Sequence, residues 1–147
     1  MAQVRRAAAN WSGDLLAGGG AVTASSSGIF DNQAITWRAR TEASEGKTSP
    51  EELLAAAHAS CYSMAISHEL SQAGFPPERV DVTVDVSADK TDSGWTVQSS
   101  AITVSAKVPG ADQALFAEKA NAAKAGCPIS RAISESVEIR LDATLES

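Results

Sequence analysis

The chain has 147 residues, which is enough for one domain with a sizeable core, and we expect a single domain over residues 1–147. Its hydrophobic content of 44% and charged content of 20% are typical of globular proteins and exclude general disorder. The formal net charge of −6 argues against nucleic-acid binding, which needs a basic face, and no apolar run approaches the ~20 residues of a membrane-spanning helix.

The first forty residues predict short strands separated by turns. Two arginines near the N-terminus are not followed by an apolar stretch, so we expect neither a secretory nor a twin-arginine signal, and a cytoplasmic protein with reduced thiols. The glycines at 18–20 and the segment 25–28 are typical of turns, and we expect a hairpin turn at the triple glycine. Residues 35–40 alternate, which predicts a strand with Arg38 and Arg40 on one face.

A long helix is the clearest element of the sequence. Ser49 fits an N-cap, Pro50 the first helical position and Glu52 the third, which together form a capping box. Glu51 is not needed for this box and is available for another role. Gly74 is the predicted stop. Apolar side chains point nearly all round the helix, so we expect it to be buried in a core or an interface.

A hairpin follows the long helix. Residues 80–86 alternate strictly between valine and polar residues, which predicts a strand with one face on the core. A turn at residues 92–94 leads into a second strand. The parity of its apolar positions changes near Ser99 and Ser100, which indicates a β-bulge.

The last part of the sequence predicts helical segments and a final strand. Asp112 is the expected cap of a helix that ends at Gly126, and Pro128 can begin another short helical turn. Residues 137–145 alternate as a strand. The complete order βββ-α-ββ-α-β predicts an α+β fold.

The chain has two cysteines. Cys61 lies inside the long helix, and Cys127 caps the last helical turn. Free cysteines usually behave as small buried hydrophobes, so purely structural thiols are the plain alternative. Reactivity is favoured because a helix N-terminus stabilises a thiolate at Cys127 and because His58 lies one turn before Cys61. Arg38 and Arg40 are candidates to stabilise a thiolate.

A zinc site is a third interpretation of these residues. His58, Cys61 and His68 share a helix face, and Cys127 could be the fourth ligand. However, His58 and His68 are ten residues apart, about 15 Å along a helix, whereas ligands of one zinc lie ~4 Å apart. We therefore expect no metal site.

Two segments resemble signature motifs of the OsmC/Ohr family, the osmotically inducible and organic hydroperoxide resistance proteins. Residues 49–65 resemble the family's central helix, and residues 123–130 resemble its second-cysteine motif. Further similar segments are residues 11–14, 89–94 and 108–110. The resemblance covers essentially the whole chain, and residues 58–64 resemble the OsmC branch more than the Ohr branch.

The resemblance implies an OsmC-like fold, with antiparallel sheets around a long buried helix in an intertwined homodimer. It implies a peroxidase that reduces organic hydroperoxides to alcohols in oxidative and osmotic stress defence. Cys61 matches the peroxide-reactive cysteine, which becomes a sulfenic acid, and Cys127 the resolving cysteine, which then forms the Cys61–Cys127 disulfide. Arg40 matches the arginine that holds thiolate and peroxide, and Glu51 the carboxylate that orients it. No bound cofactor is implied, and an external dithiol is the reductant, with a lipoyl-type dithiol as one candidate.

Three questions stay open. The segment between Arg40 and Glu51 is one residue longer than the family pattern, so Arg38 is a rival for the arginine's place. Glu51 and Cys61 are ten residues apart, about 15 Å along a helix, so an arginine must bridge them or a second subunit must supply the carboxylate. A small-molecule or lipid-binding dimer without peroxidase activity is the alternative function.

An apolar wall around the thiol would favour alkyl peroxides. The residues expected in it are Leu54, Met64 and Ile66.

Overall fold

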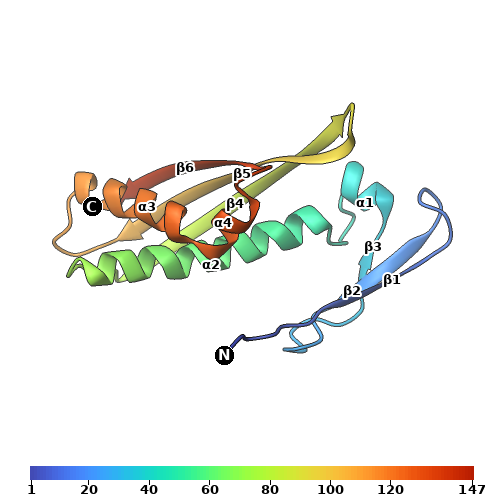
Figure 1. The fold of residues 1–147 in the computed structure, drawn as a ribbon, viewed down its shortest axis with the longest axis horizontal. Helices are drawn as coiled ribbons and strands as arrows, with labels where there is room; N and C mark the ends of the chain where they lie inside the picture. Colours follow the sequence, from blue (N-terminus) through green and yellow to red (C-terminus); the bar gives the residue numbers. More distant parts are fainter. The chain divides into compact units, whose positions relative to one another are not determined.

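A computed structural model describes residues 1–147, which form two compact units, Met1–Leu53 and Leu54–Ser147. The elements follow the order βββ-αα-ββ-αα-β (Figure 1), so the predicted α+β class is confirmed. Two short helices, α1 and α4, extend the predicted order. The sequence predicted α4 as a helical turn but did not predict α1. None of the helices combines the length and the apolar character that a membrane crossing requires.

The first unit contains a three-stranded antiparallel sheet. Its strands are β1 (Ala8–Ser12), β2 (Gly19–Thr23) and β3 (Gln33–Ile35), in the order β1-β2-β3. The predicted hairpin between β1 and β2 is confirmed, but its loop is residues 13–18 and includes only the first of the three glycines, because Gly19 and Gly20 pair with β1 as part of β2. A Cβ on Gly20 would collide with the Asn10 carbonyl oxygen, so glycine is needed there for close strand approach.

The strand predicted over residues 35–40 is wrong beyond Ile35, because the chain turns into helix α1 (Trp37–Thr41). Thr36 caps α1, since its hydroxyl accepts the Ala39 N–H at 3.1 Å. Arg38 and Arg40 therefore do not share a strand face. Two residues apart on a helix, they point in directions roughly 200° apart.

A three-stranded sheet also forms the base of the second unit. Its strands are β4 (Arg79–Thr91), β5 (Gly94–Lys107) and β6 (Glu138–Leu145), with β5 in the middle. The predicted bulge is confirmed, because Ser87 pairs with Ser99 but the next residue pairs with Val97, which leaves Gln98 without a partner. Strand β6 runs parallel to β5, so the sheet is mixed rather than antiparallel throughout. The helical crossover after β5 returns the chain to the end of the sheet where a parallel strand begins.

Three helices follow the predicted start and stop signals. They are α2 (Pro50–Gln72), α3 (Gln113–Gly126) and α4 (Pro128–Ile133). The Ser49 hydroxyl accepts the Glu52 N–H at 3.1 Å, and the Asp112 carboxylate accepts the Leu115 N–H at 2.8 Å. The capping box at α2 is only half formed as predicted, because the Glu52 carboxylate accepts from the Thr48 hydroxyl at 2.6 Å. Gly74, with φ of 87°, follows the end of α2.

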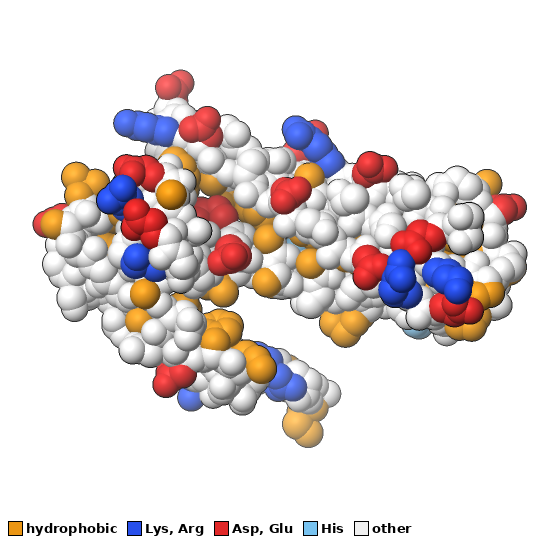
Figure 2. Space-filling view, turned by 180° about the vertical axis from the view of Figure 1, so that it is seen from behind, with side chains coloured by type: hydrophobic (Ala, Val, Ile, Leu, Met, Phe, Trp, Pro, Cys, Tyr) orange, Lys and Arg blue, Asp and Glu red, His pale blue; other side chains and the backbone are white.

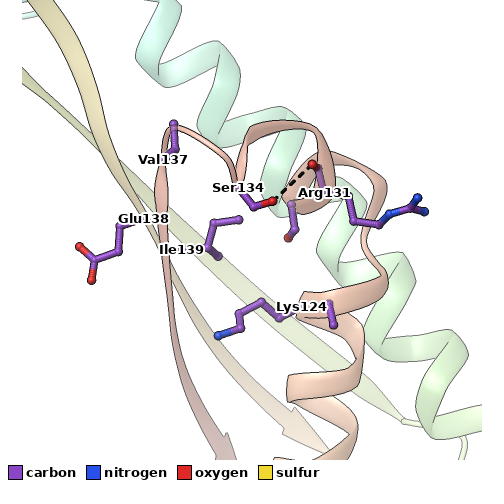
Figure 3. A pocket seen from close by; sticks show the side chains of 8 residues that line it. Lys124, Arg131, Ser134, Val137, Glu138 and Ile139 are labelled. Carbon is purple, nitrogen blue, oxygen red and sulfur yellow. Dashed lines mark hydrogen bonds between the residues drawn. The ribbon is translucent and has the colours of Figure 1, made fainter.

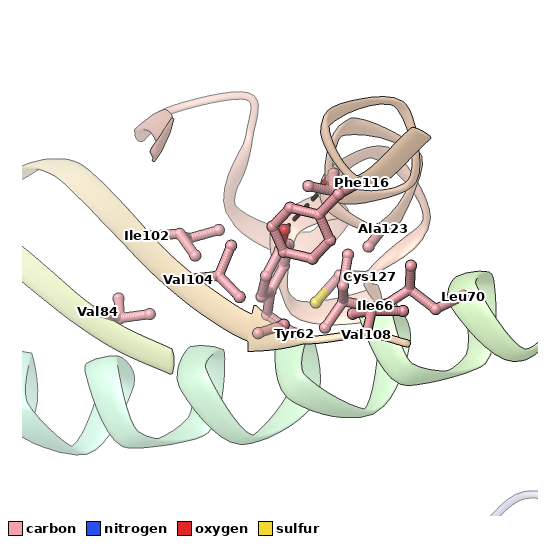
Figure 4. Packing of buried hydrophobic residues seen from close by; sticks show 12 residues of the cluster. Tyr62, Ile66, Leu70, Val84, Ile102, Val104, Val108, Phe116, Ala123 and Cys127 are labelled. Carbon is pink, nitrogen blue, oxygen red and sulfur yellow. Dashed lines mark hydrogen bonds between the residues drawn. The ribbon is translucent and has the colours of Figure 1, made fainter. Parts of the chain in front are cut away.

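The core of the second unit lies between its helices and one face of the sheet (Figure 4). Helix α2 contributes a stripe at every fourth position, which consists of His58, Tyr62, Ile66 and Leu70. Strands β4 and β5 and helix α3 contribute Val84, Ile102, Val104, Phe116, Ala120 and Ala123. The Tyr62 hydroxyl donates to the Ala120 carbonyl at 3.0 Å and so ties α2 to α3.

Helix α2 is not buried over its whole circumference in the single chain. Met64 is 67% exposed, and the space-filling view shows hydrophobic side chains reaching the surface between interspersed acidic and basic ones (Figure 2). Only one stripe of α2 faces the sheet and α3, so the core covers part of the helix, and burial of its other faces in an interface stays a prediction.

Candidate active site

Cys127 lies at the junction of α3 and α4, fully buried at 0% exposure. It is the N-cap of α4, as predicted, and Pro128 occupies the first helical position. Proline has no N–H, so Ile129 and Ser130 provide the first free donors of this helix. These donors face the sulfur, although no capping hydrogen bond of regular geometry reaches it.

The surroundings of Cys127 favour its thiolate. Burial opposes the negative charge, but the Ser130 N–H, the Cys61 thiol, the Ser130 hydroxyl and the Ile129 N–H all favour it. Together these donors hold the pKa of Cys127 below its ordinary value of 9.0.

Cys61 lies on α2 beside Cys127, with its side chain partly exposed. Burial raises the pKa of Cys61, and its hydrogen bond to Cys127 and the charge there raise it further. The two thiols are reduced, and each influences the ionisation of the other, so they titrate as a pair. The structure thus brings together the two cysteines that the sequence singled out, although they are 66 positions apart.

A cavity of about 350 Å³ opens beside Cys61. Small and apolar residues dominate its wall, which consists of Cys61, Met64, Ala65, His68, Glu69, Ala123, Gly126 and Pro128. This size lies within the range of small-molecule sites. Of the three residues expected in an apolar wall, Met64 lines this cavity, but Leu54 is absent from it. Ile66 belongs to the core instead, because it lies on the opposite stripe of α2.

Arg40 and Glu51 form an ion pair within the first unit. The Arg40 Nη2 and Nε donate to Glu51 Oε1 at 2.8 and 2.9 Å, and Nε also lies 3.1 Å from Oε2. The side chains are only 28% and 11% exposed, and the guanidinium lies 5.7 Å from the ring centre of Trp37. Arg38 differs, because its side chain is 65% exposed and pairs with Glu42 and Glu45 on the surface. This contrast favours Arg40 over its rival as the functional arginine.

His58 is fully buried, and both of its ring nitrogens have partners. Nδ1 lies 2.7 Å from the Ser100 hydroxyl on β5, and Nε2 lies 2.7 Å from the Ser130 hydroxyl on α4. Burial lowers the pKa of His58, so the imidazole is neutral. The structure contains no group of three or more His, Cys, Asp or Glu side chains suited to a metal ion. Ser100 and Ser130 were missed by sequence reasoning, because no local pattern marks partners so distant in the chain.

A second hollow, of about 310 Å³, lies between α3, α4 and the start of β6 (Figure 3). Lys124 reaches across it toward β6, whereas the Arg131 guanidinium points away from the strand. The two cations therefore do not converge on one point, and the Ser134 hydroxyl is bonded to the Arg131 carbonyl at 3.4 Å.

Solved structures identify the class of fold. The crystal structure of the organic hydroperoxide resistance protein OhrB of Bacillus subtilis superposes with a TM-score of 0.71 at 24% identity, covering 94% of this chain and 97% of that one. An organic hydroperoxide resistance protein from Elizabethkingia anophelis gives a TM-score of 0.73 at 19% identity, covering 99% and 100%. The chain therefore has the fold of the OsmC and organic hydroperoxide resistance proteins.

Sequence comparisons identify the family. The family model OsmC, described as OsmC-like protein, matches residues 43–142. Peroxiredoxin OsmC of Escherichia coli is 42% identical over 143 residues, which cover 97% of each chain. OhrB of Bacillus subtilis is 27% identical over 119 residues, covering 80% of this chain and 85% of its own. The chain belongs to the OsmC family.

Proposed function

We propose that this protein is a thiol-dependent peroxidase that reduces organic hydroperoxides to alcohols. The observation that carries the proposal is the pairing of two reduced thiols, one on an apolar cavity and the other buried at a helix N-terminus. Its relatives bear the names peroxiredoxin and organic hydroperoxide resistance protein. Such chemistry uses the cysteines themselves and needs no prosthetic group.

The difference in exposure between the two cysteines supports Cys61 as the residue of the first step. A peroxide in the cavity reaches the Cys61 sulfur, whereas Cys127 is closed off at 0% exposure. The Cys61 thiolate attacks the terminal peroxide oxygen, the O–O bond breaks, and the alkoxide takes a proton and leaves as the alcohol. Cys61 is thereby oxidised to sulfenic acid.

Cys127 acts in the second step. Its thiolate, favoured by the start of α4, attacks the sulfur of the sulfenic acid; the S–O bond breaks, and hydroxide leaves as water with one proton. The product is a Cys61–Cys127 disulfide. An external dithiol then reduces it by two exchange steps and is itself oxidised, which returns both thiols.

Arg40 has the role of stabilising the Cys61 thiolate in this proposal, with Glu51 fixing the direction of the guanidinium. The surroundings of Cys61 within its own unit raise its pKa, so the nucleophile needs a cation from elsewhere. Arg40 is the better of the two candidates because its ion pair is largely buried and makes three close N–O contacts.

The proposal includes a homodimer in the cytoplasm, where thiols stay reduced. Ala39 is the one buried residue of the first unit, and a small sheet without a core needs a covering surface. Met64 and its neighbours on α2 offer apolar area for the same purpose. Sedimentation at micromolar concentration should give a dimer, and a stable, active 15.2 kDa species would contradict this part.

The decisive experiment treats the reduced protein with one equivalent of cumene hydroperoxide and maps the product by mass spectrometry. We expect cumyl alcohol in equal amount and a peptide cross-linked between Cys61 and Cys127. Parallel runs with hydrogen peroxide test the cavity, since an apolar wall favours the alkyl peroxide. If the thiols stay reduced and no alcohol forms, the proposed function is wrong.

A further inference from the structure

One buried group has no part in the reaction described above. His58 lies at 0% exposure between two hydroxyls, with Nδ1 2.7 Å from Ser100 and Nε2 2.7 Å from Ser130. Both serines are buried as well, at 0% and 2%. A buried polar chain of this kind is stable only when each member is satisfied, so each hydrogen has a defined place.

The hydrogen-bonded group of Ser100, His58 and Ser130 lies next to the thiol pair. Cys127 is the N-cap of α4 and Ser130 is its third helical residue, the position whose groups lie beside the N-cap side chain. The Ser130 hydroxyl is 2.7 Å from His58 Nε2, and its presence favours the thiolate of Cys127. The buried side chains therefore run from Ser100 through His58 and Ser130 to the neighbourhood of Cys127.

We propose that His58, acting through the Ser130 hydroxyl, is a positioning residue that prepares Cys127 for disulfide formation. This inference rests on the proposed function and deepens its second step. The Ser130 hydroxyl carries one hydrogen, and it can stabilise a thiolate only when that hydrogen points to Cys127. The imidazole holds it there by donating Nε2–H to the Ser130 oxygen, while Nδ1 accepts from Ser100.

The orientation matters only in the reduced state. In the disulfide Cys127 carries no negative charge, so the Ser130 hydrogen no longer has a thiolate to stabilise. The neutral imidazole keeps the same tautomer in both states, so the three residues neither gain nor lose a proton during the reaction.

The test compares two matched variants, Ser130→Ala and Ser100→Ala. Each removes one buried hydroxyl that lies 2.7 Å from the same ring, so each has a similar cost in folding. Only Ser130→Ala removes a hydroxyl from the first turn of α4, beside Cys127. The pKa of Cys127 is measured from thiolate absorbance in a Cys61→Ser background, because that substitution keeps a hydroxyl donor beside the remaining sulfur. The rates of sulfenic acid and disulfide formation are measured by rapid quench and mass spectrometry, in the serine variants that keep both Cys61 and Cys127.

We expect Ser130→Ala to raise the pKa of Cys127 by about one unit and to slow disulfide formation about tenfold, without slowing the formation of the sulfenic acid. Ser100→Ala should change the pKa of Cys127 by less than about half a unit and the rate of disulfide formation by less than about threefold, because Nε2 can still donate to Ser130. His58→Leu should resemble Ser130→Ala, and His58→Gln should recover part of the loss, since its amide N–H reaches a similar point.

Two results would overturn the inference. One is an unchanged pKa of Cys127 in the Ser130 variant, and the other is equal slowing by both serine variants in step with their loss of melting temperature. The pKa of Cys127 can be measured without turnover, so this test is valid even if the wild-type protein does not consume peroxide. Peroxide consumption thus tests the proposed function, and the Cys127 titration tests this inference separately.

Discussion

Replacing Arg40 by methionine should destabilise the fold and slow the chemistry, and the first effect can be worked out from the ion pair. Breaking a buried pair costs about 3–5 kcal/mol and an exposed one about 0–1 kcal/mol. The side chains here are 28% and 11% exposed and make three N–O contacts between 2.8 and 3.1 Å. We therefore expect a loss of about 2 kcal/mol, or about 6 °C in melting temperature.

A double-mutant cycle separates the pair from its surroundings. Arg40→Met, Glu51→Gln and the double variant are unfolded in urea at one fixed protein concentration, and the coupling free energy should be about 2 kcal/mol. Arg38→Met is the matched control, because its partners are largely exposed, and it should cost less than about 0.5 kcal/mol.

The chemical effect is measured on the first turnover, as the rate of Cys61 oxidation by excess cumene hydroperoxide. Arg40→Met should raise the pKa of Cys61 and slow this step at least about tenfold. Arg40→Lys should recover only part of the rate, because lysine lacks the planar fork, and Glu51→Gln should cost less than loss of the arginine. Arg40 is not the functional arginine if Arg38→Met slows the step as much as Arg40→Met with folding unchanged, or if both variants leave the rate intact.

The remaining predictions concern the thiols and the buried core. Cys61→Ser should abolish peroxide consumption, whereas Cys127→Ser should complete one turnover and stop at a sulfenic acid that over-oxidises in excess peroxide; mass spectrometry would expose reversed roles. Tyr62→Phe should lower the unfolding free energy by about 1 kcal/mol, because it removes the buried hydroxyl bond to the Ala120 carbonyl, and no loss in urea would contradict this. Burial holds the pKa of His58 below its ordinary 6.5, so its contribution to stability should be complete above that pH and fall as the pH drops toward the folded-state pKa. Urea titrations of the wild type and His58→Gln should diverge in that acidic window, with the wild type the more pH-sensitive of the two.

The long elements could be predicted because their signals are local. Ser49, Gly74 and Asp112 mark helix ends by their own side chains or lack of one, and the valine alternation of β4 reports a sheet face directly. A change of parity in β5 was enough to find the bulge at Gln98. These features need no knowledge of the rest of the chain.

The predictions from sequence were wrong where a short segment is compatible with two secondary structures, or where the contacting residues lie far apart in the chain. Five residues from Thr36 onward alternate as well in a strand as in a capped helical turn, and the threonine cap decided for the helix. The role of Gly20 depends on a neighbouring strand, not on its own turn. The partners of His58 lie 42 and 72 positions away, so the buried hydroxyls could not be found from spacing.

The closeness of Cys61 and Cys127 also determines how strong a reductant the protein requires. A bond between residues 66 positions apart removes about 4 kcal/mol of chain entropy from the unfolded state. By the same thermodynamic cycle, the fold protects that bond against reduction by an equal amount. Expressed as a potential for a two-electron couple, this is roughly 90 mV below that of the same cysteines in an unfolded chain. We therefore expect a Cys61–Cys127 disulfide to be reopened only by dithiols of low potential, and the oxidised protein to melt at a higher temperature than the reduced protein.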